Sequence, residues 1–233
     1  MHNGSGLLQL ALPLPFILFF VAVAVVAVLR VRSNRRRTEA VRAWATARGW
    51  SLFEADPDLA RRWGGSPFGT GGSRRATEIL SGPLGGRQVL SFRYSYTTSN
   101  GKSTTRHEHH VVAVFLPMLL PTLDVTPEGF GAKIVKAFGG QDIQFESEQF
   151  NSRWRVASPD PRFAHDVIHP RVMERLLQPD VSGMTIRFVG DAVLTWTTGV
   201  PRVETIDWRA WMLSQMIDSI PDYVWQDRQY PAR

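Results

Sequence analysis

The densest group of side chains that could do chemistry is His107-Glu108-His109-His110, because imidazole and carboxylate groups bind zinc and transfer protons. The surrounding pattern predicts a β-strand, and successive side chains of a strand point to opposite faces. His107 and His109 then share one face, so at most two imidazoles converge, whereas a zinc site needs three or four ligands. We interpret the segment as a solvated strand face and keep a metal site as the alternative.

His165 and His169 form a second pair, with the four-residue spacing that places two zinc ligands on one face of a helix. Pro170 disfavours helical backbone at the residue before it, so the two rings are not expected to share that face. We therefore expect this pair to cap and pack two consecutive helices. The four candidate metal ligands are His107, His109, His165 and His169, and no residue is predicted to be catalytic.

A glycine-rich segment at residues 69–75 resembles a phosphate-binding loop in composition only. It lacks the Lys-Ser/Thr pair of a P-loop, and no helix clearly begins after it. We predict a flexible connection, with an anion or lipid-headgroup contact through Arg74 and Arg75 as the alternative. Glu146 and Glu148 are predicted to lie at the surface and at a helix cap rather than to form a catalytic pair.

Two classes of chemistry lack the residues that they need. The chain has no cysteine, so it has no disulfide, thiolate metal site or cysteine nucleophile. It also has no Gly-x-Ser-x-Gly nucleophile elbow, so serine hydrolase chemistry has no local support. No motif indicates a cofactor.

The elements that must position these residues begin with strands. Three extended runs predict an antiparallel meander, and a later pair of runs predicts a hairpin that turns at Gly190-Asp191. The predicted strands span residues 76–81, 88–98, 103–115, 184–189 and 192–197, with shorter ones at 51–54, at 123–125 and around Ile143 and Phe145. Leu116-Pro117 is predicted to end the third run.

Helical periodicity and capping residues predict helices between these strands. They cover residues 38–48, a short segment after Asp56-Pro57, about 130–138, the segments that begin at Pro161 and Pro170, and a last amphipathic helix capped by Asp207. Hairpins and helices without strict alternation indicate an α+β fold. The expected architecture is an N-terminal transmembrane helix followed by one domain with an antiparallel sheet of hairpins and packed helices.

The N-terminal part of the chain has the composition of a membrane anchor. Residues 7–29 carry no charge. As a helix they reach about 34 Å, enough to span a hydrocarbon core of about 30 Å. A group of arginines follows, at Arg30, Arg32, Arg35, Arg36 and Arg37. By the positive-inside rule they hold the C-terminal flank in the cytoplasm and leave the N-terminus outside. A cleaved secretory signal ending near Ala22-Val23-Ala24 is the alternative, although the apolar run continues past it.

The charge of the remaining chain is nearly balanced. The 233 residues include 27 basic and 21 acidic ones, and five of the basic but none of the acidic residues lie before residue 38. Residues 38–233 therefore carry 22 basic and 21 acidic groups. A nucleic-acid binder needs a basic face on its folded domain, so nucleic acid is not a predicted partner. We predict two parts, an anchor with its basic flank at residues 1–37 and one globular domain at residues 38–233.

Several short motifs give this domain a resemblance to known proteins. They are Arg48-Gly49-Trp50, Pro67-Phe68-Gly69, Phe92-Arg93-Tyr94-Ser95-Tyr96, Phe145-Glu146-Ser147-Glu148 with Phe150-Asn151, Asp160-Pro161-Arg162-Phe163-Ala164 with Asp166, and His169-Pro170-Arg171 with Met173-Glu174. The pattern resembles an uncharacterised, mainly actinobacterial family of single-pass membrane proteins with a domain of unknown function, over most of residues 38–225. The resemblance implies no activity and no catalytic residues.

The sequence thus predicts a single-pass protein of the inner (plasma) membrane whose cytoplasmic domain is a non-catalytic interaction or scaffold module. Its predicted partners are the lipid bilayer through residues 7–29, an unknown protein and, through the basic flank, anionic lipid headgroups. One alternative is a metal-dependent hydrolase that uses histidines. The other is a domain that senses anionic lipid through residues 35–37 with Arg74 and Arg75.

Overall fold

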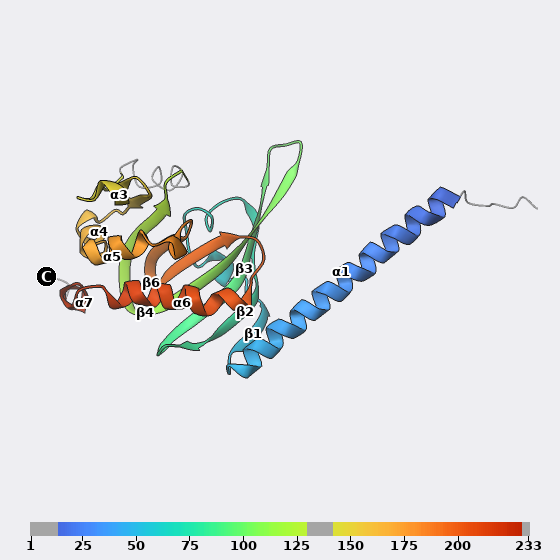
Figure 1. The fold of residues 1–233 in the computed structure, drawn as a ribbon, viewed down its shortest axis with the longest axis horizontal. Helices are drawn as coiled ribbons and strands as arrows, with labels where there is room; N and C mark the ends of the chain where they lie inside the picture. The colour runs from blue at the N-terminus through green and yellow to red at the C-terminus, as the bar shows by residue number, and fades with distance from the viewer. Residues whose placement is uncertain (1–13, 130–141, 230–233) are drawn as a thin grey trace, which may run out of the picture. The chain divides into compact units, whose positions relative to one another are not determined.

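The computed structural model describes residues 14–129 and 142–229, and the chain separates into two compact units, Met1–Trp44 and Ala45–Arg233 (Figure 1). Each unit is considered by itself. The helix predicted at residues 130–138 lies outside the described residues. The division of the chain into parts at residues 1–37 and 38–233 stays a prediction.

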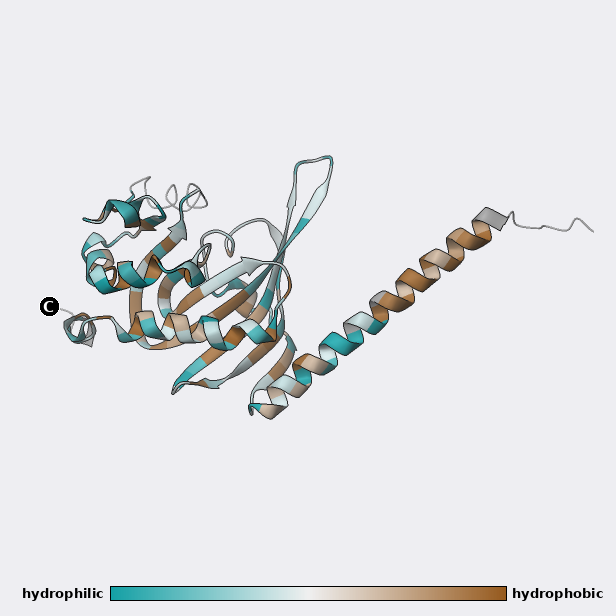
Figure 2. Ribbon diagram, in the orientation of Figure 1, coloured by the Kyte–Doolittle hydropathy of each residue, from teal (hydrophilic) through white to brown (hydrophobic). Residues whose placement is uncertain are grey.

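The first unit consists of helix α1, which spans Leu14–Ala47 and whose last three residues belong to the second unit. The apolar stretch and the helix predicted from residue 38 are therefore one continuous helix. Its first half is hydrophobic and its second half hydrophilic (Figure 2), and its apolar side chains, such as Phe19 and Val25, are exposed. By length and composition, α1 is sufficient to cross a membrane.

A glycine ends α1 and starts the domain. Gly49 has a φ of 65°, and the backbone N–H of Trp50 donates to the carbonyl of Ala45 at 2.9 Å, which is the bond of a Schellman cap. The Trp50 indole then lies flat against Gly82 on a neighbouring strand, and its Nε1 donates to the carbonyl of Pro83 at 3.2 Å. Trp50 thereby attaches the chain that follows Gly49 to the sheet.

The second unit is built on one antiparallel sheet, which confirms the predicted α+β class. Its strands are β1 (Ser51–Ala55), β2 (Gly72–Leu84), β3 (Arg87–Ser99), β4 (Thr104–Pro127), β5 (Trp154–Ala157) and β6 (Thr185–Thr198). The order is β1-β2-β3-β4, and both β5 and β6 pair with β4. The predicted meander is confirmed. The turn between β2 and β3 consists of Gly85 and Gly86 alone, and both have the positive φ that a two-residue hairpin requires.

Two strand boundaries were predicted wrongly because prolines and glycines lie inside strands here. Leu116-Pro117 does not end β4, and residues 123–125 belong to the same strand. The register between β4 and β6 shifts on both sides of Leu120, so Pro117 and Pro121 lie where the ladder is interrupted and a missing N–H costs little.

The hairpin predicted at Gly190-Asp191 is also wrong, since β6 continues through both residues. Gly190 has a φ of 58° and faces Leu120 across the irregular stretch. A left-handed glycine at such a position bends a strand without reversing it. The result is a long pair of strands, β4 and β6, in the middle of the domain.

The described helices follow the predicted caps with one exception, and one predicted strand is absent. They are η1 (Leu59–Arg61), α3 (Glu148–Asn151), α4 (Pro161–Val167), α5 (Pro170–Leu176), η2 (Pro179–Val181), η3 (Val203–Thr205), α6 (Ile206–Asp218) and α7 (Asp222–Gln229). Thr205 and not Asp207 occupies the N-cap position of α6. Residues 143–145 form no strand, because the Asn151 side chain bonds both backbone groups of Phe145.

Different segments cover the two faces of the sheet. The face covered by α6, in front of the sheet in Figure 1, is called the helix face. On the other, the aromatic face, rings from residues 63–68 and from strands β3 and β6 pack together: Trp63, Phe68, Phe92, Tyr94 and Trp196. Three alanines on the strands, Ala76, Ala113 and Ala192, leave room for these rings.

An ion pair is buried beside this cluster. The Arg187 Nε donates to Asp124 Oδ1 at 2.5 Å, and the two side chains are 3% and 1% exposed. Arg187 Nη1 also donates to the carbonyl of Gly64 at 2.7 Å, and the guanidinium lies over the Trp196 ring. Burial raises the pKa of Asp124 against the opposing effect of Arg187. The pair joins β4, β6 and the segment before Phe68.

Substitution of Asp124 by asparagine should reduce the free energy of unfolding by about 3–5 kcal/mol, because Arg187 is left buried without a countercharge. Asp191→Asn is the matched control, since Asp191 pairs with Arg62 at the surface and such pairs contribute about 0–1 kcal/mol. Urea denaturation of the solubilised chain, followed by tryptophan fluorescence, measures both. Equal losses for the two variants would contradict the structural role of the buried pair.

Candidate functional site

The first candidate site is a cavity of about 330 Å³ at the edge of the aromatic face. Its rings come from three strands: Tyr96 of β3, His109 of β4 and Trp196 of β6. Ser66, Thr126, Thr185 and Thr198 complete the wall with hydroxyl-bearing side chains. Thr197 also borders the cavity, but its hydroxyl accepts a hydrogen bond from Arg209 on the helix face. Alternation along each strand explains the convergence, because side chains two residues apart share a face.

Tyr96 lies in a stack of rings at this cavity. Its ring centroid is 4.8 Å from that of His107 and 5.9 Å from that of His109, with interplanar angles of 19° and 5°. The prediction that His107 and His109 share a face is therefore confirmed. His107 Nε2 lies 2.9 Å from the hydroxyl of Thr98.

His109 departs from the predicted solvated strand face. Both of its ring nitrogens are buried, and neither has a hydrogen-bond partner within the described part of the chain. Burial lowers the pKa of His109, and the neighbouring His107 lowers it further. His109 is therefore a neutral ring near pH 7.

His110 is buried on the helix face, so the solvated interpretation is wrong for this residue as well. Its Nε2 lies 2.9 Å from the Ser91 hydroxyl, while the backbone N–H of Arg202 and the Nη1 of Arg209 both approach its Nδ1 at 3.4 Å. Both of these groups only donate, so Nδ1 accepts and Nε2 carries the proton toward Ser91. A serine nucleophile needs the reverse arrangement, in which histidine accepts its proton.

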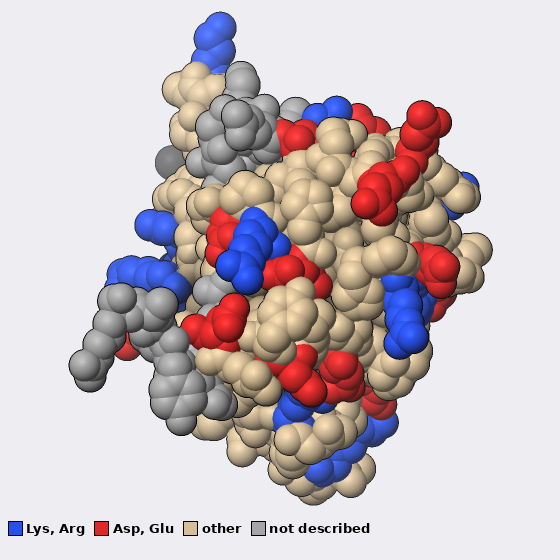
Figure 3. Space-filling model, turned by 90° about the vertical axis from the view of Figure 1, so that its left-hand side faces the viewer, with Lys and Arg blue, Asp and Glu red and all other residues tan. Residues whose placement is uncertain are grey.

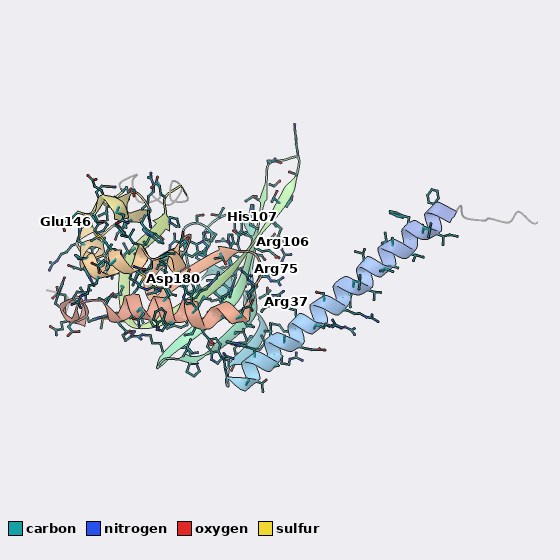
Figure 4. All side chains as sticks on the ribbon, in the orientation of Figure 1. Arg37, Arg75, Arg106, His107, Glu146 and Asp180 are labelled. Carbon is teal, nitrogen blue, oxygen red and sulfur yellow. The ribbon has the colours of Figure 1, made fainter. Side chains whose placement is uncertain are left out.

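The other predicted histidines lie in the helical part of the domain. His165 on α4 contacts the ring of Phe145 at 4.9 Å, and His169 before α5 bonds the carbonyl of Ser219 through Nε2 at 2.9 Å. With Glu146 they line a separate cavity of about 390 Å³. His107 and Glu146 mark these two distinct parts of the domain (Figure 4).

No three His, Asp or Glu side chains of residues 14–129 and 142–229 come together as a set that could hold a metal ion. The four histidines that were predicted as candidate metal ligands form two pairs with different contacts. His107 and His109 stack on a sheet tyrosine, and His165 and His169 contact a phenylalanine and a helix end.

The structure places the predicted basic residues on two elements. Arg30, Arg32, Arg35, Arg36 and Arg37 all belong to α1. Arg74 and Arg75 lie on β2, so the flexible connection predicted for residues 69–75 is wrong from Gly72 onward. Arg74 Nη1 donates to the carbonyl of Phe68 at 3.2 Å, and the Tyr94 hydroxyl donates to the same carbonyl at 2.6 Å. Arg74 therefore holds the segment that covers the aromatic face.

An exposed tryptophan marks a third feature, on α6. Trp211 is 49% exposed, and the Arg175 guanidinium lies 5.6 Å from its ring centroid. Two hydrogen bonds to Asp180, at 2.7 and 2.8 Å, hold Arg175 in place and keep the pKa of Asp180 below its ordinary value. Exposed tryptophan and arginine are typical of residues that dominate protein interfaces. We call Trp211, Arg175 and Asp180 the Trp211 patch.

The charged groups of the domain show no single dominant sign on the face drawn in Figure 3, where acidic and basic side chains alternate. This agrees with the balanced composition of residues 38–233.

No family model and no curated protein sequence matches the chain. A solved structure does have a similar fold: the crystal structure of the mycobacterial trehalose monomycolate transport factor A, TtfA. The TM-score is 0.52 at 14% identity, and the alignment covers 78% of this chain and 94% of that one. At this identity the likeness shows a shared fold alone. Membership of an actinobacterial family stays a prediction.

The buried His109 should make stability depend on pH. The pKa of this residue is lowered in the folded state, so the unfolded chain binds a proton more readily, and stability should fall as the pH drops below about 6.5. His109→Phe should reduce the loss of stability between pH 7.5 and 5.5. Thr198→Ala, which alters the same cavity but keeps His109, is the control and should retain the full loss. Parallel pH profiles for His109→Phe and the unaltered chain would contradict this assignment.

Proposed function

We propose that this chain is a single-pass membrane protein whose N-terminal helix anchors a cytoplasmic, non-catalytic binding domain at the plasma membrane. The observation that carries the proposal is the continuous helix α1, which runs from an uncharged apolar stretch through five arginines to the first residues of the domain. The positive-inside rule supports the orientation, with the arginines and the domain in the cytoplasm.

The chemistry of the domain supports binding rather than catalysis. Among the described residues, Ser91 and His110 form the one close serine and histidine pair, and their shared proton is in the wrong position for a nucleophile. Both side chains are buried on the helix face. The cavity on the aromatic face has neutral walls. The similar fold is that of a transport factor, so we propose that this domain is an accessory factor that assists a membrane transport process without catalysing a reaction.

The two alternatives have less support. A hydrolase that uses metal would need ligands beyond each pair of histidines, because His109 lines one cavity while His165 and His169 line another. A sensor of anionic lipid would use Arg74 and Arg75, but Arg74 donates to the Phe68 carbonyl. Contact with anionic headgroups would then depend on Arg75 and on the arginines of α1.

Topology is the first test of the proposal. Ser103 lies exposed at the tip of the β3–β4 hairpin, which projects from the sheet in Figure 1, so Ser103→Cys gives the chain a single accessible thiol. With the domain in the cytoplasm, a membrane-impermeant maleimide should label this variant only after the cells are lysed.

The matched variant Ser5→Cys puts the single thiol before the anchor and should be labelled in intact cells. If Ser103→Cys is labelled in intact cells while Ser5→Cys is protected, the orientation is reversed and the domain has an envelope role.

The Trp211 patch tests the interaction role. A photo-crosslinking amino acid at position 211 should give one discrete crosslinked product in membranes, because an exposed tryptophan next to arginine is typical of an interface centre. Trp211→Ala should change the free energy of unfolding by less than about 1 kcal/mol, since surface substitutions rarely cost more.

The control for crosslinking is the same amino acid at exposed Leu119 on β4. Products of equal yield and pattern at both positions, or no product at 211, would rule out the Trp211 patch as the interface.

A further inference from the structure

The cavity on the aromatic face has walls that suit one class of ligand. Flat rings of Tyr96, Trp196 and His109 line it together with threonine and serine hydroxyls, and no carboxylate, ammonium or guanidinium group is part of the wall among the described residues. The nearby charged side chains of Arg187 and Asp124 form an ion pair with each other. The wall therefore offers flat apolar surfaces and neutral hydrogen-bonding groups.

The ring nitrogens of His109 indicate the kind of polar group that is missing. A neutral imidazole has one donor and one acceptor, and a buried polar group without a partner costs about 1–3 kcal/mol. Both nitrogens lack a partner within the described part of the chain. A hydroxyl group can donate and accept, so it serves either tautomer, whereas a carboxylate or phosphate oxygen only accepts.

The size of the cavity limits the ligand. A volume of about 330 Å³ lies at the lower end of the range for small-molecule sites, about 300–1,000 Å³, and leaves room for one or two six-membered rings. Sugar rings present C–H groups on their flat faces and hydroxyls at their edges. Aromatic side chains pack on the C–H groups of the faces, and threonine hydroxyls form hydrogen bonds with the hydroxyls at the edges.

We propose that this cavity binds a neutral sugar ring, either free or as the head group of a glycolipid. The proposal rests on the non-catalytic binding role given above and adds the class of ligand. The rings of Tyr96 and Trp196 pack against the faces of the sugar, and Thr185 and Thr198 form hydrogen bonds with its hydroxyls.

A second cavity gives the glycolipid form a place for its chain. This cavity, of about 560 Å³, shares Gly183 with the first, and Pro127 in its wall directly follows Thr126 in the wall of the first. Its wall includes the apolar residues Trp154, Leu176 and Leu177 together with the charged residues Glu128 and Arg153. An alkyl chain attached to a sugar in the first cavity would meet apolar residues beside charged ones there.

The test uses the full chain in a phosphocholine detergent, because detergents with sugar heads would compete for the cavity. Saturation-transfer NMR is recorded with the methyl glycosides of glucose, galactose and mannose and with octyl glucoside. Glucose 6-phosphate and octyl pentaethylene glycol are the charged and sugar-free controls. We expect transfer to the sugar ring protons of at least one neutral glycoside. The signal for glucose 6-phosphate should be about tenfold weaker, because neutral walls do not compensate for the lost hydration of its phosphate.

A blocking variant locates the binding. Thr198 is exposed at the edge of the cavity, so Thr198→Trp should fill it and remove the transfer while the circular dichroism spectrum stays unchanged. Thr105→Trp is the matched control, since Thr105 is an exposed threonine of β4 outside the cavity wall, and it should keep the transfer.

Each outcome decides the proposal. Transfer to a methyl glycoside supports a free sugar, and transfer to the ring of octyl glucoside alone supports a glycolipid. Absence of transfer to any sugar ring, equal transfer with Thr198→Trp, equal transfer to glucose 6-phosphate, or transfer only to the alkyl chains of both octyl compounds overturns it. None of these failures affects the membrane orientation, which the cysteine labelling decides separately.

Discussion

The ion pair between Arg187 and Asp124 is the constraint on which the domain depends. The two residues face each other in the register of β4 and β6, so a slip of one residue would put the two charges on opposite faces of the sheet and leave them unpaired. Arg187 also holds the carbonyl of Gly64, and with it the segment that supplies Trp63 and Phe68 to the aromatic face. The position of Trp196, and hence one wall of the cavity, follows from this pairing.

The sequence was sufficient for the fold class because its signals are local. Gly49, the proline at the start of α4 and the alternating residues of β3 each act within a few positions, and the elements that they predict are present. The errors at Leu116-Pro117 and Gly190-Asp191 have one cause. These residues usually end strands, but here they lie on opposite strands in the same irregular part of the ladder, which is a property of two strands and not of either alone.

The candidate site was predictable only in part for the same reason. The prediction that His107 and His109 share a face is correct, because alternation is a property of one strand and can be read from the sequence of that strand. The burial of His109 depends on Tyr96 from the previous strand, and that of His110 depends on Arg209, which is 99 residues away in the sequence. No local pattern contains those contacts. The threonines of β6 form no recognisable motif in the sequence.

The shared use of β4 has a consequence for biosynthesis. This strand ends at Pro127, but its long partner β6 ends about 70 residues later, at Thr198. At about 5–20 residues per second, a nascent chain carries the β6-facing edge of β4 unpaired for about 4–14 s. An exposed strand edge is a template for aggregation, and proline is one of the residues that protect such an edge. Pro117 and Pro121, which interrupt the ladder in the finished sheet, therefore guard the nascent chain against pairing with a neighbour before β6 has been made.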